Sequence, residues 1–214
     1  MHKLIRPIPP VCLSRYQHGR DNWRSMSPEH KGEIWLKLDE MQQKRCAYCE
    51  ALIKTDKENS NSHIEHFRQR DRYHQGTFLW GNLFGSCNRM NSCGKYKDDL
   101  PAYNHQDLIK MDTEDPEHFL DFLPDGNVAP IKGLTPAEKN RAVETIRIFN
   151  LNGSLRQIRE TAVKGYMQTA EEFAAYAEDP EFDEADWLPL LQEELDQIKD
   201  LPFTTAIKHV LLPA

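Results

Sequence analysis

Two pairs of cysteines constrain this chain more than any other feature, because they enclose a short run of histidine and glutamate. Cys46 and Cys49 are separated by two residues, a spacing at which two thiolates reach one tetrahedral zinc ion. Cys87 and Cys93 are separated by five residues, and the loop between them can fold back toward the same ion. Four thiolates make a closed site, so the sequence predicts structural zinc that joins two distant segments.

The run His63-Ile64-Glu65-His66 lies between the two pairs, and we expect it to form a strand. Adjacent side chains on a strand face opposite sides, but at a twisted or bulged strand end Glu65 and His66 can both reach one pocket. A carboxylate binds a hard ion such as Mg²⁺, and a neutral imidazole removes a proton from water. Phosphodiester hydrolysis needs both. Asn82 is the candidate to hydrogen-bond the His66 ring and fix its tautomer.

The composition favours a soluble, folded protein, with 214 residues of which 39% are hydrophobic and 29% charged. No apolar run approaches the roughly 20 residues that span a bilayer, and the first residues lack the apolar region of a signal peptide. We therefore expect a cytoplasmic protein without a membrane partner. In a reducing compartment, paired cysteines bind metal more often than they form disulfides.

The net charge of −7 is unevenly distributed along the chain. Residues 41–97 contain ten Lys or Arg and five Asp or Glu, a net charge of +5. Residues 170–214 contain twelve acidic residues and two lysines, a net charge of −10. The basic segment can meet nucleic-acid phosphates, whereas the acidic tail is interpreted as a solvated face. An excess of this size gives only weak non-specific affinity, so a nuclease of this kind would depend on a partner.

Local signals predict helices on both sides of the cysteine region. Ser27 and Pro28 begin a helix whose apolar stripe contains Ile34, Leu38 and Met41. A short helix is expected after Cys93, followed by a hairpin over residues 118–130 that turns at Asp125-Gly126. The remaining expected elements are a helix capped by Thr135 with Val143, Ile146 and Phe149 buried, a long helix over residues 154–177 and an acidic helix over residues 187–199.

The predicted fold class is therefore α+β, with a small metal-binding unit and mostly helical extensions. We divide the chain into an N-terminal arm and helix (1–45), a core that contains the zinc site (46–130) and a helical C-terminal region (131–214). The last residues, 202–214, are apolar enough to bury in a groove of a partner protein.

The pattern Cys46-x2-Cys49, Glu65-His66, Asn82 and the second cysteine pair resembles the HNH endonucleases, whose catalytic core is the ββα-metal fold. The stretches HIEHFR, FLWGNLFGSC and CGKYKD resemble more narrowly the PtuB group of HNH proteins, from the Septu and retron-associated anti-phage defence systems. The close resemblance covers residues 46–98, and PDGNVAP and IRIFNLN further along are also similar.

The resemblance implies a nuclease effector that cuts DNA or RNA with a PtuA-like ATPase, and in a retron system with a reverse transcriptase and msDNA. It implies that His66 is the general base, that Glu65 binds a catalytic Mg²⁺ or Mn²⁺, and that Asn82 orients His66. The four cysteines would hold structural Zn²⁺. Arg68 and Lys97 would contact phosphates.

The sequence departs from the HNH pattern at the third metal ligand, a His or Asn expected on the helix after Cys93. Gly94 and Lys95 stand at that position. Asn91 lies before the cysteine, and Asp98, one turn further along, is able to bind Mg²⁺. The candidates Asn91, Lys95 and Asp98 all remain open.

Two other functions fit parts of the pattern. A non-catalytic zinc scaffold of a defence or DNA-processing complex needs the cysteines but not the His66 imidazole. A zinc hydrolase that uses His63 and His66 as ligands is disfavoured, because the two residues lack the i, i+4 helical spacing of such enzymes.

Overall fold

A helix leads the chain into the first cysteine pair, as the capping signal predicts. The computed structural model describes residues 1–56, 58–181 and 183–212. Helix α1 covers Pro28–Gln42, and the Ser27 hydroxyl accepts a hydrogen bond from the His30 amide. The predicted apolar stripe is confirmed, since Ile34, Leu38 and Met41 are buried. Before α1, residues 1–27 lie against the body of the protein, and Met1 and Leu4 are part of its core.

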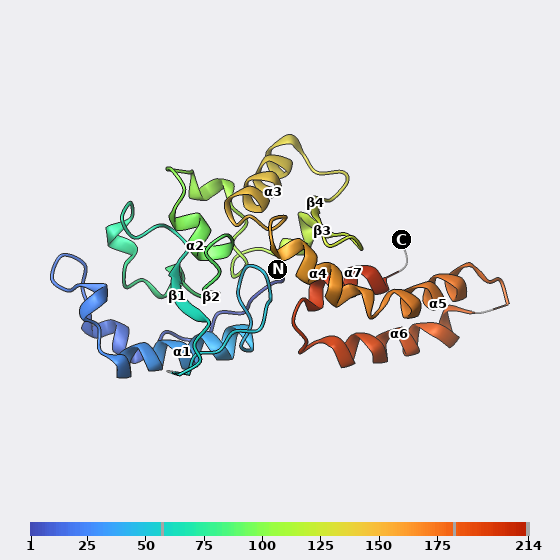
Figure 1. Ribbon diagram of the computed structural model, residues 1–214, viewed down its shortest axis with the longest axis horizontal. Coiled ribbons are helices and arrows are strands. Elements are labelled where there is room, and N and C mark those ends of the chain that lie inside the picture. Colours follow the sequence, from blue (N-terminus) through green and yellow to red (C-terminus); the bar gives the residue numbers. More distant parts are fainter. Residues whose placement is uncertain (57, 182, 213–214) are drawn as a thin grey trace.

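Two antiparallel strands and a short helix carry the residues that the sequence singled out. Strand β1 (Ser62–His66) pairs with β2 (Leu83–Cys87), so that Ser62 lies opposite Cys87. Helix α2 (Cys93–Asp98) follows β2 and packs against it. This unit lies at one side of Figure 1, above α1. The predicted strand and the α+β class are confirmed.

A second hairpin and a well-capped helix follow. Strands β3 (Leu120–Phe122) and β4 (Val128–Pro130) form the predicted hairpin, and Gly126 has a φ of +81° in its turn. Helix α3 (Pro136–Ile148) begins with the predicted capping box of Thr135 and Glu138. Single 3₁₀ turns occur at Val11–Arg15, Trp23–Ser25, His74–Gly76, Trp80–Asn82, His105–Asp107 and Pro116–His118 (η1 to η6).

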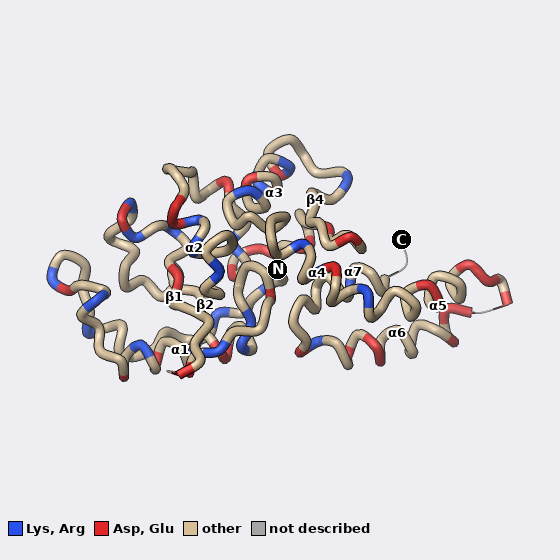
Figure 2. Tube along the Cα trace, in the orientation of Figure 1, with Lys and Arg blue, Asp and Glu red and all other residues tan. Residues whose placement is uncertain are grey.

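The C-terminal region is helical, but its divisions differ from the prediction. The long helix expected over residues 154–177 is two helices, α4 (Leu155–Lys164) and α5 (Met167–Glu178), because the helix ends at Gly165. Helix α6 (Glu184–Ile198) runs antiparallel beside α5, and α7 (Thr204–Leu211) closes the chain. In Figure 2 acidic residues gather where α5 and α6 meet, and basic residues surround β1, β2 and α2.

Helix α7 contains most of the segment for which the sequence predicts docking on a partner. It packs against α4, α5, α6 and β3 of its own chain. Thr205, Ala206, Ile207 and Leu211 are buried in this contact. The apolar character of the segment is therefore explained by the fold itself, and residues 213–214 of the predicted segment lie outside the described residues.

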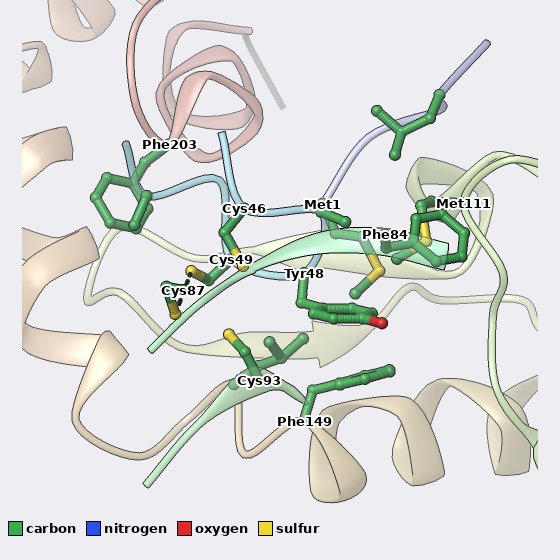
Figure 3. Packing of buried hydrophobic residues seen from close by; sticks show 14 of the residues in the cluster. Met1, Cys46, Tyr48, Cys49, Phe84, Cys87, Cys93, Met111, Phe149 and Phe203 are labelled. Carbon is green, nitrogen blue, oxygen red and sulfur yellow. Dashed lines mark hydrogen bonds between the residues drawn. The ribbon is translucent and has the colours of Figure 1, made fainter. Parts of the chain in front are cut away.

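The core joins the cysteine region to α3 through aromatic contacts. The Tyr48 ring stacks on the Phe149 ring with a centroid distance of 4.1 Å and an interplanar angle of 19°, and Figure 3 shows this stack beside the cysteines. Val143, predicted to be buried, is exposed. The buried face of α3 includes Thr145 instead. The Thr145 hydroxyl accepts a hydrogen bond from the Ile109 amide at 2.9 Å, which satisfies this buried polar group.

Candidate metal centre and the strand that carries His66

Four cysteines from separate parts of the chain converge in one buried cluster. The sulfur atoms of Cys46, Cys49, Cys87 and Cys93 all lie within 4.8 Å of one another, and all four are free thiols. Sulfurs bound to one tetrahedral zinc ion stand about 3.8 Å apart, so only a small inward movement separates this arrangement from a zinc site. In Figure 3 the first pair comes from the turn after α1, and Cys93 approaches from the start of α2. The predicted convergence is confirmed, and the cluster could hold a metal ion such as zinc.

The cluster is electrostatically unbalanced without a cation. Burial opposes a charge on the Cys46 thiol, but hydrogen bonds from its three cysteine neighbours outweigh burial and hold its pKa well below the ordinary value. The hydrogen bond with Cys46 raises the pKa of Cys49, and burial raises the pKa of Cys93. A divalent ion removes this conflict because it binds the sulfurs as thiolates.

Gln42, at the end of α1, fixes the first cysteine pair against β2. Its Nε2 donates to the carbonyls of Arg45 at 2.7 Å and Gly85 at 2.9 Å. Its Oε1 accepts from the Gly85 amide at 2.7 Å, and the Ala47 amide donates to the Gly85 carbonyl at 3.0 Å. The sequence analysis missed Gln42, because its partner is 43 residues away and a glutamine at a helix end carries no distinguishing signal.

Glu65 points from β1 toward α2, where its carboxylate already has a cation. Its side chain is 1% exposed, Oε1 lies 2.5 Å from Lys97 Nζ, and Oε2 lies 3.1 Å from His63 Nε2. Burial alone would raise the pKa of Glu65, but the Lys97 charge outweighs it and lowers the pKa. Gly94 leaves the necessary space, since a Cβ at this position would overlap the Glu65 carboxylate.

The predicted Mg²⁺ or Mn²⁺ site gains no support from the described residues. Three or more His, Cys, Asp or Glu ligand atoms converge only at the four cysteines in the described parts of the chain. Of the third-ligand candidates, Asn91 accepts a hydrogen bond from Ser154, Lys95 is cationic, and Asp98 accepts from Lys97 Nζ at 2.8 Å. The Lys97 ammonium lies 2.5 Å from Glu65 Oε1 and neutralises the charge of that carboxylate.

His66 follows Glu65 at the end of β1, where strand alternation directs adjacent side chains to opposite faces. The His66 ring is 6% exposed, and its Nε2 lies 3.0 Å from the Thr77 carbonyl. A carbonyl only accepts, so the N–H is on Nε2 and the lone pair is on Nδ1. Burial lowers the pKa of His66 to about 4, which keeps the ring neutral at pH 7. Trp23 meets the ring edge-on with a centroid distance of 4.6 Å.

Asn82 holds the loop between the strands rather than the His66 ring. Its Oδ1 accepts from the Arg68 amide at 2.8 Å, and its Nδ2 donates to the carbonyls of Arg68 at 3.2 Å and Gly76 at 3.1 Å. Thr77, the residue after Gly76, supplies the carbonyl that fixes His66. The predicted direct hydrogen bond is thus replaced by an indirect one, in which Asn82 shapes the loop and the loop orients the ring.

The two residues predicted to contact phosphates have different surroundings. Lys97 has no exposed side-chain surface, and its ammonium binds Glu65, the His66 carbonyl and Asp98. In this arrangement its ammonium has three partners inside the protein, and the contact with a phosphate stays a prediction. Arg68 is half-buried, and its guanidinium lies over the Tyr73 ring at 3.3 Å from the centroid. Its N–H groups remain a reachable set of phosphate donors.

The fold and the cysteine cluster define a small α+β protein with a candidate metal centre, and no helix among the described residues is long and apolar enough to cross a bilayer. The chain is 34% identical over 89 residues to Septu protein PtuB of Bacillus thuringiensis. No family model matches the chain.

The matched stretch is 42% of this chain but only 32% of PtuB. The chain therefore spans about a third of the length of this relative. The match supports a relation to PtuB. It names a Septu protein, and it offers no support for the retron reverse transcriptase or msDNA.

Proposed function

We propose that this protein is the nuclease effector of a Septu-like anti-phage defence system, and that it hydrolyses nucleic-acid phosphodiester bonds together with a PtuA-like ATPase. The similarity to PtuB supports the defence role and the partner. The geometry of His66 supports the chemistry, because the Thr77 carbonyl fixes the N–H on Nε2 and leaves the Nδ1 lone pair to accept a proton.

In the proposed reaction, Nδ1 of His66 takes a proton from water as the water oxygen bonds to phosphorus. The bond from phosphorus to the leaving oxygen then breaks, and the leaving oxygen takes a proton from a solvent water and departs as a hydroxyl group. Thr77 keeps the ring in the required tautomer throughout, and the adjacent Glu65 charge favours the imidazolium that forms. The Arg70 charge acts in the opposite direction.

The cysteines have a structural role in the proposed function and take no part in the reaction itself. Zn²⁺ held by four thiolates would have no open position for substrate, so its role would be to fix β2 and α2 relative to the turn after α1. No step is assigned to a second metal ion, because Lys97 already occupies the place beside Glu65.

The dependence on a partner rests on the burial of His66. Trp23, in η2, covers the ring edge, and Phe78 lies beside Trp23 with a centroid distance of 6.1 Å. Substrate would reach His66 only after Trp23 moves. A partner that displaces the segment around η2 would therefore release the activity, and the separated chain would be a weak nuclease.

One observation favours a second candidate, a zinc scaffold without activity of its own. Glu65 is fully neutralised inside the protein and His66 is covered, so the strand is stable as it stands. A scaffold requires the cysteines but not the His66 imidazole, which separates the two functions experimentally.

The test uses cells that carry this chain with its partner ATPase, and the complex purified from them. Wild type should restrict phage plating and nick plasmid DNA, single-stranded DNA or RNA in vitro. His66→Ala should lose both activities and keep about one zinc per chain, whereas Cys87→Ser should lose zinc as well. Full phage restriction by His66→Ala would establish the scaffold instead.

A further inference from the structure

A cavity of about 590 Å³ lies beside the loop that Asn82 holds. Its walls come from two segments, the loop after β1 and the segment between α2 and the start of α3. The residues that line it include the aromatic, apolar and basic side chains of Phe67, Arg68, Tyr73, Leu79, Trp80 and His105. Its size is within the range of small-molecule sites, roughly 300–1,000 Å³. The proposed hydrolysis at His66 does not use it.

The cavity offers flat apolar walls that are held in place. Trp80 is fixed by its indole N–H, which donates to the Pro7 carbonyl at 2.9 Å, and the Arg6 guanidinium covers its ring at 4.9 Å. Tyr73 is fixed by the Arg68 guanidinium on its face. Rigid aromatic walls of this kind can stack against a planar ring. A nucleobase is such a ring, and its stacking on aromatic side chains does not depend on which base it is.

The cavity also carries uncompensated positive charge. Arg141 pairs with Glu114, and Lys110 pairs with Asp112 at 2.7 Å, but Asp112 also pairs with Arg6 at 2.6 Å and so serves two cations. Among the described residues Arg68 has no carboxylate partner, and its guanidinium lies over the Tyr73 ring. Burial lowers the pKa of His105, and the Arg68 charge lowers it further. The edge N–H groups of Arg68 can therefore take a phosphate while the apolar walls take its base.

The position of the cavity connects it to the proposed reaction. Phe67, which lines the cavity, follows His66 directly, and their Cα atoms are about 3.8 Å apart. The two side chains leave the backbone on opposite sides, so the same short segment faces the proposed scissile bond and the cavity. A nucleic-acid strand that passes over this segment would have one nucleotide at each.

We propose that this cavity binds one unpaired nucleotide next to the phosphodiester that His66 cleaves, and so selects single-stranded or unwound substrate. This inference rests on the proposed nuclease function. Arg68 binds the phosphate of that nucleotide, and the base lies between Tyr73, Leu79 and Trp80.

The test measures binding in a His66→Ala background, so that substrate is not consumed. The probes are a fluorescent ten-nucleotide oligo(dT), the same length of duplex DNA, and free thymidine monophosphate, each titrated with the full chain in complex with its partner. The His66→Ala protein without a further change should bind the single strand at least about 10-fold more tightly than the duplex, as expected for one stacked base with its phosphate contact.

Two variants test the cavity, one by filling it and one by removing the phosphate contact, and each has a matched control. Leu79→Trp fills the cavity from a residue that is 50% exposed, and Leu190→Trp makes the same change at a residue on α6 that is 53% exposed. Arg68→Ala removes the phosphate contact, and Arg89→Ala removes an exposed arginine from another loop. The cavity variants should weaken oligo(dT) binding by about 10-fold or more, and the controls by less than 2-fold.

Equal binding by Leu79→Trp, Arg68→Ala and their controls would overturn the proposal. Tighter binding of free thymidine monophosphate than of oligo(dT) would also overturn it, because the cavity would then be a site for free nucleotides. The outcome is separable from the proposed function. Absence of cleavage by wild type would end the nuclease proposal while leaving these binding results intact, and a cleaving protein without the binding effect would end only this inference.

Discussion

The ammonium of Lys97 lies 2.5 Å from the carboxylate of Glu65, and both side chains are almost completely inaccessible to solvent. Lys97 uses its remaining N–H groups on the His66 carbonyl and on Asp98, each at 2.8 Å. This ion pair ties β1 to α2 and supplies the positive charge that Glu65 requires. It also shows why a metal ion is not needed to balance the carboxylate.

Removal of the ammonium alone should be costly. Lys97→Met leaves Glu65 buried without a partner, and we expect a loss of about 3–5 kcal/mol in the free energy of unfolding. The double variant Glu65→Gln with Lys97→Met should recover most of this loss. Lys95→Met, on the same helix but half-buried, is the control. Urea titrations in the presence of zinc measure the difference, and a Lys97→Met loss under 1 kcal/mol would argue against the ion pair.

Gly94 should not tolerate a side chain. Gly94→Ala places a methyl group against the Glu65 carboxylate, and overpacking of this kind costs about 1–3 kcal/mol. Gly32 in α1 has open space around it, so Gly32→Ala should stabilise the protein by about 0.5–1 kcal/mol. The two changes in melting temperature should have opposite signs, and equal signs would contradict the packing described at Gly94.

Each of the four clustered cysteines should be required for metal, and Cys12 should not be. Cys87→Ser should reduce bound zinc from about one per chain toward zero and lower the melting temperature, because a structural zinc site contributes directly to folding. Cys12 is buried elsewhere, and Cys12→Ser should keep its zinc. Metal analysis of the purified proteins is sufficient, and full zinc occupancy in Cys87→Ser would remove the cluster as the site.

The attachment of α7 should depend on pH. Although burial opposes ionisation of Glu117, hydrogen bonds from His209 and Lys208 outweigh it and lower its pKa from 4.5 to about 2. This contribution is present above pH 4.5 and is lost as the pH falls toward 2. Contacts with Glu117 and Asp121 outweigh burial of His209 and raise its pKa above 6.5. That contribution is complete below pH 6.5 and is lost as the pH rises above the raised value.

Between pH 4.5 and 6.5 both contributions therefore hold α7 in place. Hydrogen exchange of α7 amides, corrected for the intrinsic pH dependence of exchange, should show the strongest protection in this window. Glu117→Gln should flatten the profile on both sides. A profile that is already flat in wild type would mean that these groups do not anchor α7.

The features that sequence could predict are those set by neighbours in the chain. Ser27 and Thr135 cap helices through residues three positions away, and both caps are present. The cysteine pairs could be predicted to converge because the chemistry of zinc selects their spacing. The strand at His63 followed from its short run between polar loops.

The features that sequence could not predict depend on distant partners. Lys97 resembles a phosphate-binding residue until α2 is placed beside β1, where Glu65 takes its charge. Asn82 has the right character to orient His66, but the Arg68 and Gly76 backbone lies nearer. Trp23, 43 positions before His66 in the chain, reaches the ring only through the path of the N-terminal segment over Phe78.

The most direct test of the role of His66 is the single-turnover cleavage rate of the partner complex, compared between wild type, His66→Ala and His118→Ala at equal zinc content. His118 is an exposed histidine outside the site. We expect His66→Ala to be slower than wild type by about 100-fold or more, as for loss of a general base, and His118→Ala to be unchanged. Cleavage by His66→Ala within a few-fold of the wild-type rate would contradict the assignment of His66 as the base.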